Sequence, residues 1–173
     1  ELTDMMHIKA IEIIARSLRD SVKGDPEGRA QMALGQYIAG MGFSNVGLGI
    51  VHSMAHPLSA VYDIPHGVAC AILLTPVLKF NAPSTANKYR DIAVAMGVKN
   101  TEDMSIEQAR QACIEAVEKL SVDVGIPQKL TQLGVKEEDL QFLSESAFVD
   151  ACTPGNPRNV SVEAIKEIYK SIM

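Results

Sequence analysis

The sequence predicts an all-α protein of about seven to nine helices. Apolar residues recur at spacings of three and four, as at Ile8, Ile11, Ile14 and Leu18, and this is the period of an amphipathic helix. No run alternates apolar and polar residues as a half-buried strand does. Hydrophobic residues make up 47% of the 173 residues and charged residues 21%, which is typical of an ordered globular chain.

The first two helices are predicted from their periodicity and their ends. One spans residues 3–22, with Thr3 as its N-cap, and ends before Gly24. Asp25 and Pro26 suit the N-cap and first turn of a second helix, which continues to about Ile38. Glycines just beyond that residue weaken its end.

Two nearly all-apolar stretches are predicted to form buried helices. The first spans residues 43–61 and mixes small with large side chains, which is typical of a central helix with close neighbours. Pro57 lies within it, so we expect a kink or break there, because proline lacks the amide hydrogen and clashes with the preceding turn. The second stretch, residues 65–80, begins with a proline and is interrupted late by Pro76.

The segments 84–96, 105–121 and 137–147 are more polar and are predicted to be outer helices. Helical spacing recurs in four segments: 84–96, 105–121, 137–147 and 160–173. Ser161 is a candidate N-cap for the last of them. Residues 151–157 (ACTPGNP) form a predicted loop because of their proline and glycine content.

Composition and charge exclude several classes of partner. The net charge is −5 without a stripe of Lys or Arg, which argues against nucleic acid. No stretch approaches the roughly 20 apolar residues of a membrane span, and the N-terminus lacks the pattern of a signal peptide. The widely spaced Cys70, Cys113 and Cys152 suit reduced thiols in a cytoplasmic protein. The chain opens within a helical pattern, which suggests a piece of a longer protein.

Three of the four histidines fall within fifteen residues, in VHSMAHPLSAVYDIPHG. A buried imidazole needs a partner for each nitrogen, and three in one place can satisfy that need by binding a metal. His52 and His56 share a helical face, and His66 is in the first turn of its helix, where the macrodipole favours the neutral ligand form. The alternative is a helical binding module whose histidines are structural.

A zinc hydrolase is a third interpretation, because His52 and His56 have the spacing of a His-Glu-x-x-His motif. Position 53 is a serine, and no Glu or Asp occurs between Gly40 and Tyr62. The general base of that mechanism is therefore missing, and the hydrolase interpretation loses most of its support.

The stretch 42–81, GFSNVGLGIVHSMAHPLSAVYDIPHGVACAILLTPVLKFN, resembles the histidine signature of the iron-containing (group III) alcohol dehydrogenases. The resemblance extends over nearly the whole chain and includes CTPGNPR near its end. It implies the C-terminal half of a dehydroquinate synthase-like fold, with residues 1–173 as one all-α metal-binding domain. The family's N-terminal α/β domain, which holds NAD(P), is absent here, and no Gly-rich strand-to-helix turn occurs.

The resemblance also implies roles for individual residues. By position, His52 and His66 match metal ligands, and the family's other two ligands, an Asp and a His, lie upstream of this chain. His56 matches a catalytic histidine that lies by the nicotinamide and substrate and takes part in proton transfer. Phe43 and Cys152 resemble substrate-pocket positions, although core packing and a buried thiol are the simpler interpretations.

The implied activity is NAD(P)-linked interconversion of small alcohols or diols and aldehydes, with Fe²⁺ or Zn²⁺ as the metal. We expect the intact enzyme to be a homo-oligomer and this chain alone to be inactive. One departure from the family pattern is Ser59, where a glycine is usual, and a second is the position of Pro76.

Overall fold

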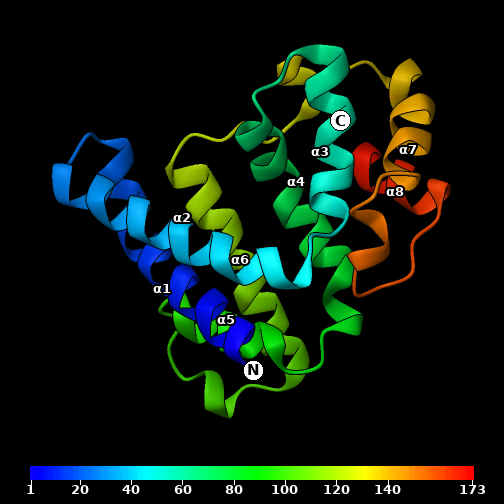
Figure 1. The fold of residues 1–173 in the computed structure, drawn as a ribbon. Coiled ribbons are helices and arrows are strands. Elements are labelled where there is room, and N and C mark those ends of the chain that lie inside the picture. The colour runs from blue at the N-terminus through cyan, green and yellow to red at the C-terminus, as the bar shows by residue number, and fades with distance from the viewer. The chain divides into compact units, whose positions relative to one another are not determined.

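The computed structural model describes all 173 residues and contains eight α-helices and no strands, as the sequence predicted (Figure 1). The chain folds as two compact units. The first comprises Glu1–Gly47 and Thr85–Val124, and the second comprises Leu48–Ser84 and Gly125–Met173. The sequence predicted that residues 1–173 form one metal-binding domain, and this stays a prediction.

The first unit is built from four α-helices and one short 3-10 helix. They are α1 (Leu2–Val22), α2 (Pro26–Val46), α5 (Lys88–Ala95), η2 (Thr101–Asp103) and α6 (Ile106–Asp123). Helices α1 and α2 lie side by side, and α1 also contacts α5 and α6 (Figure 1). The close pairing of α1 with α2 depends on small residues, because a side chain at Gly35 would meet Ile14 and one at Gly42 would meet the ring of His7.

The second unit carries the histidines. Its elements are α3 (Ile50–Tyr62), α4 (His66–Asn81), η1 (Ala82–Ser84), η3 (Leu130–Leu133), η4 (Glu137–Asp139), α7 (Leu140–Phe148), η5 (Thr153–Gly155) and α8 (Val162–Lys170). Helix α3 packs against α4 and α7, and α8 contacts both α4 and α7. Their apolar faces form one core, in which Met54, Leu58, Leu73 and Leu143 are fully buried.

Helix α4 is strongly apolar. Together with η1 it forms a stretch, His66–Ser84, that is long and apolar enough to cross a membrane by length and composition alone. About a third of that stretch is buried in the structure. It also packs against α3 and α8, as a core helix of a globular unit does.

Several predicted helix ends are confirmed. The carboxylate of Asp25 accepts a hydrogen bond from the Gly28 amide at 2.6 Å, with Pro26 in the first turn of α2. The hydroxyl of Ser161 accepts from the Ala164 amide at the start of α8. The predicted cap at Thr3 is wrong, because α1 already begins one residue earlier, at Leu2.

The boundary of the predicted central helix is also wrong. Helix α2 passes through Gly40 and Gly42 and ends at Val46, so residues 43–46 belong to it. The chain then breaks at Gly47, whose φ of 79° is a conformation that glycine adopts without strain. Helix α3 begins only at Ile50, after an extended Gly49.

Pro57 lies inside α3 without breaking it, so the expected break does not occur. Pro57 and its neighbours Met54, Ala55 and Leu58 are all buried. Burial of this apolar face stabilises the helix by more than one missing backbone hydrogen bond costs. Pro76 is accommodated within α4 in the same way.

Candidate metal and proton-transfer site

The structure brings the three predicted histidines together where α3 turns into α4. His52 and His56 are one turn apart on α3, and His66 is the first residue of α4. Asp63, in the left-handed conformation, ends α3, and the chain reverses within the next two residues. The ring centroid of His66 lies 5.5 Å from that of His52 and 5.4 Å from that of His56. The cluster therefore comes from two helices joined by a tight turn.

His52, His66 and Cys70 form a group of metal-donor atoms, since one ligand atom from each lies within 4.8 Å of the others. Cys70 is one turn after His66 on α4, and its sulfur lies 3.5 Å from His66 Nε2. Burial, reinforced by the neighbouring histidines, lowers the pKa of His52 below its usual value. Burial raises the pKa of the Cys70 thiol to about 11.

This donor set fits a divalent transition metal. Imidazole nitrogen and cysteine sulfur are ligands for zinc, and imidazole also suits iron. Cys70 was not predicted as a ligand from the sequence, although its spacing of four from His66 places both side chains on one helical face. The ligand roles of His52 and His66 stay predictions.

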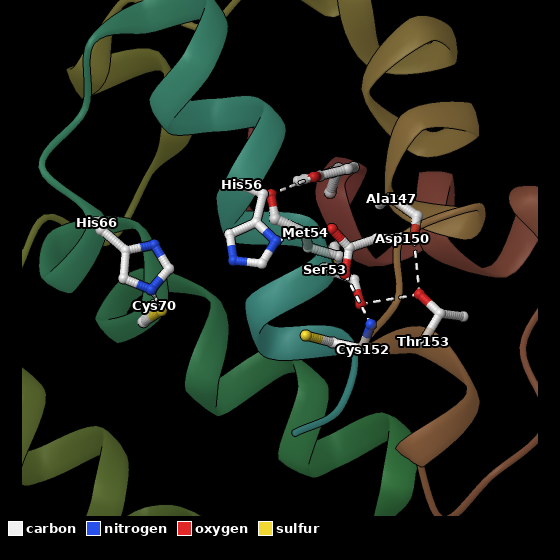
Figure 2. A network of polar contacts seen from close by, with 10 residues as sticks. Ser53, Met54, His56, His66, Cys70, Ala147, Asp150, Cys152 and Thr153 are labelled. Carbon is white, nitrogen blue, oxygen red and sulfur yellow. Dashed lines mark hydrogen bonds and ion pairs between the residues drawn. The ribbon is translucent and has the colours of Figure 1, made fainter. Parts of the chain in front are cut away.

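His56 has a carboxylate partner that was not predicted from the sequence. Its Nδ1 lies 2.7 Å from Asp150 Oδ2, across 94 positions of sequence (Figure 2). Because an ionised carboxylate only accepts hydrogen bonds, the hydrogen in this bond belongs to Nδ1. Burial acts to raise the pKa of Asp150, but hydrogen bonds from the Cys152 amide and from His56 outweigh it, and the net pKa is lowered. Asp150 is therefore an anion facing His56.

Cys152 lies in the same place, as one donor atom each of His56, Asp150 and Cys152 fall within 4.8 Å of one another. Burial raises the pKa of the Cys152 thiol, and the hydrogen bond and charge of Asp150 act in the same direction. Phe43, the other predicted pocket residue, is in the first unit, in the last turn of α2, and is 40% exposed. The substrate-pocket roles of both residues stay predictions.

A buried hydroxyl chain fastens the Cys152 loop to α3. Thr153 Oγ1 lies 2.8 Å from Ser53 Oγ and 2.6 Å from the carbonyl oxygen of Ala147 (Figure 2). A threonine hydroxyl has one hydrogen, so both contacts are satisfied when Ser53 donates to Thr153 and Thr153 donates to Ala147. Ser53 is one turn before His56, and the loop is thereby held against the helix that carries the histidine.

Asn156 and Arg158, which come after Thr153 in the chain, fasten the loop to α4. The side-chain amides of Asn156 and Asn81 exchange two hydrogen bonds, at 2.9 and 2.8 Å. Arg158 donates to the Phe80 carbonyl at 2.6 Å, and its guanidinium lies 4.2 Å from the centre of the Phe80 ring. The predicted loop at 151–157 is thus an ordered bridge between α7, α3 and α4.

A sequence profile of the Fe-containing alcohol dehydrogenase family, C-terminal part, matches residues 1–173. The chain belongs to the iron-containing alcohol dehydrogenase family. It is 60% identical over 168 residues to lactaldehyde reductase of Escherichia coli K12, a match that covers 97% of this chain and 44% of the relative. It is 43% identical over 171 residues to 1,3-propanediol dehydrogenase of Citrobacter freundii, covering 98% and 44%.

Solved structures give the same family. A crystal structure of 1,3-propanediol oxidoreductase superposes with a TM-score of 0.97 at 41% identity, covering 100% of this chain and 46% of that one. Alcohol dehydrogenase from Oenococcus oeni gives a TM-score of 0.95 at 37% identity, covering 100% and 45%. The chain has the helical C-terminal fold of iron-containing alcohol dehydrogenases and spans less than half the length of these relatives.

Proposed function

We propose that this chain is the metal-binding C-terminal part of an enzyme that interconverts small alcohols or diols with aldehydes, using NAD(P). The observation that carries the proposal is the cluster of His52, His56 and His66 at the α3–α4 turn. Family membership supports it, as does the likeness to a lactaldehyde reductase and a 1,3-propanediol dehydrogenase. No nucleotide-binding turn occurs in the chain, so we propose that it is inactive alone.

His52 and His66 are the proposed metal ligands of this chain. They supply imidazole nitrogens from two helices, with the Cys70 sulfur within 4.8 Å of both donor atoms. The family name favours iron, and zinc suits the same donors. A metal held there would supply Lewis-acid polarisation of the substrate oxygen, and a bound nicotinamide would supply the acceptor or donor of hydride.

His56 is the proposed proton carrier. Its Nδ1 is occupied by Asp150, so the proton exchanged with substrate is held at Nε2. In the oxidising direction the alcohol hydroxyl loses its proton to Nε2 as the carbon loses hydride, and the product is the aldehyde. In the reducing direction Nε2 returns the proton to the oxygen. General acid–base assistance of this kind contributes about 10²–10⁴-fold to a rate.

Cys152 and Phe43 are the proposed substrate-pocket residues. The placement of Cys152 supports its role, because one donor atom each of Cys152, His56 and Asp150 lie within 4.8 Å of one another. The role of Phe43 rests on the family resemblance alone. We also propose that the full protein acts in the cytoplasm as a homo-oligomer.

The test is a steady-state assay of the full protein, reconstituted with Fe²⁺ or Zn²⁺, on 1,2- and 1,3-propanediol with NAD⁺ and NADP⁺. We expect turnover of at least one diol, and a fall in kcat of about 10²–10⁴-fold for His56→Gln with metal content unchanged. A metal-loaded protein that oxidises neither diol, or a His56→Gln variant with full kcat, would refute the proposal.

A further inference from the structure

We propose that Asp150 is a positioning residue for His56, one that keeps the ring hydrogen on Nδ1 and turns Nε2 toward His66. This inference rests on the proposed proton-transfer role of His56. The 2.7 Å contact between Asp150 Oδ2 and His56 Nδ1 carries it. Figure 2 shows the second ring nitrogen of His56 on the side away from Asp150, facing His66.

The carboxylate of Asp150 is held at both oxygens. Oδ2 accepts from His56, while Oδ1 accepts from the backbone amide of Cys152 at 2.8 Å. The side chain of Asp150 is 20% exposed, against 44% for His56, so the fixed partner is the better-buried one. A carboxylate with both oxygens engaged orients an imidazole more firmly than a freely rotating one.

The position of Asp150 in the chain is unfavourable for helix stability. It follows the C-terminal end of α7, where the helix dipole favours a cation over an anion. Its backbone bonds, from its own amide to Ala147 and from the Thr153 amide to its carbonyl, need no acidic side chain. The contacts that do need a carboxylate are those to His56 and to Cys152, whose amide and thiol both bond to it.

The surrounding loop does not depend on this carboxylate. Ser53, Thr153 and Ala147 fasten the loop to α3 through buried hydroxyls, and Asn156 fastens it to Asn81. A change at Asp150 that preserves its shape should therefore leave the loop in place. This independence makes the orienting effect measurable apart from folding.

The decisive variant is Asp150→Asn in the full protein. An asparagine keeps the shape but has one acceptor oxygen, whereas the site offers three donors: the His56 Nδ1–H, the Cys152 amide and the Cys152 thiol. At least one of these bonds must fail. We expect kcat to fall by about 10- to 100-fold with little change in KM, metal content or thermal midpoint.

The second measurement observes the ring of His56 directly. In the zinc-loaded protein with ¹⁵N-labelled histidine, long-range ¹⁵N–¹H NMR spectra should show His56 with its hydrogen on Nδ1. In Asp150→Asn, the His56 signals should shift toward the Nε2–H form. A structural ion pair without an orienting role would leave this pattern unchanged when one oxygen is replaced by an amide.

Asp123→Asn is the matched control. Asp123 forms an ion pair with Arg19 at 2.8 Å and is 27% exposed, but it lies in the first unit and touches no histidine. We expect its kcat and histidine spectra to match those of the unmutated protein. Equal falls in kcat for Asp123→Asn and Asp150→Asn would overturn the proposal.

Four further outcomes distinguish the possibilities. Full kcat in Asp150→Asn, or an unchanged Nδ1–H pattern, would overturn the proposal, as would loss of metal and a lowered thermal midpoint, which would assign Asp150 a structural role. If His56→Gln retained kcat while the unmutated protein showed the Nδ1–H pattern, the proton role of His56 would fail. The orientation of its ring by Asp150 would then still stand.

Discussion

Gly155 lies directly against the backbone carbonyl of Leu48, so that a Cβ atom at position 155 would overlap the Leu48 oxygen. Leu48 stands just before α3, and Gly155 ends the short helix η5 in the loop that carries Cys152. The absence of a side chain at this position lets the loop reach the start of α3. The position of the loop therefore depends on the close approach of the Gly155 backbone to the Leu48 backbone.

Gly155→Ala should lower the free energy of unfolding by about 1–3 kcal/mol, because backbone on both sides must shift. Gly40→Ala is its control, since nothing lies within 4 Å of a Cβ there and the residue is inside α2. Alanine in a helix is favoured over glycine by about 0.5–1 kcal/mol, so this variant should be stabilised. Denaturant unfolding of both variants checks the pair, and changes of the same sign would refute the argument.

Two serines on α3 should respond in opposite ways to replacement by alanine. Ser59 Oγ is buried without a hydrogen-bond partner, so Ser59→Ala should raise the free energy of unfolding by about 1 kcal/mol. Ser53 is fully buried and bonded to Thr153, so Ser53→Ala should lower it by a similar amount. Thermal unfolding distinguishes them, and a stabilised Ser53→Ala would contradict the hydroxyl chain described above.

The sequence predicted the helical fold and the histidine cluster because both are local. The periodicity of apolar residues gave the helices, and the spacing of His52, His56 and His66 put all three within fifteen residues. The spacing alone paired His52 with His56. In the structure, the turn after α3 brings His66 nearer to each of them than they are to one another.

Non-local contacts escaped prediction. The approach of Asp150 to His56 depends on how α7 packs on α3, which no local pattern encodes. The break at Gly47 was also missed, because residues 43–61 are apolar almost throughout and the glycines among them could equally mark close helix packing. A kink or break was expected at Pro57, but α3 continues through it among buried neighbours.

Ionisation of Cys113 should make the free energy of unfolding depend on pH in the alkaline range. It is fully buried, and burial raises the pKa of its thiol from the ordinary 9.0 to about 11. Below pH 9 both folded and unfolded chains keep the proton. Between pH 9 and 11 only the unfolded chain releases it, so the free energy of unfolding should fall across this window.

The measurement is the pH dependence of urea unfolding for the unmutated protein and for Cys113→Ala. The variant starts from a lower stability because of the cavity it creates, but its stability should decline less steeply between pH 9 and 11. Parallel declines would show that Cys113 does not retain its proton in the folded protein.

The proposed site stands or falls with the histidines that hold the metal. His52→Ala and His66→Ala each remove a proposed ligand, whereas His56→Ala removes a ring that faces Asp150. Loss of a side chain that only hydrogen-bonds to a ligand typically weakens metal binding by about 10- to 100-fold, and loss of a ligand itself should weaken it at least as much. His52→Ala and His56→Ala are the matched comparison, because both residues lie on α3.

The most direct test is the metal content of the full protein and these three variants, purified in parallel and measured by mass spectrometry of the elements. The account predicts that His52→Ala and His66→Ala lose the metal while His56→Ala retains it at the level of the unmutated protein. Retention of metal by His52→Ala and His66→Ala, or its loss in His56→Ala alone, would contradict the proposed site.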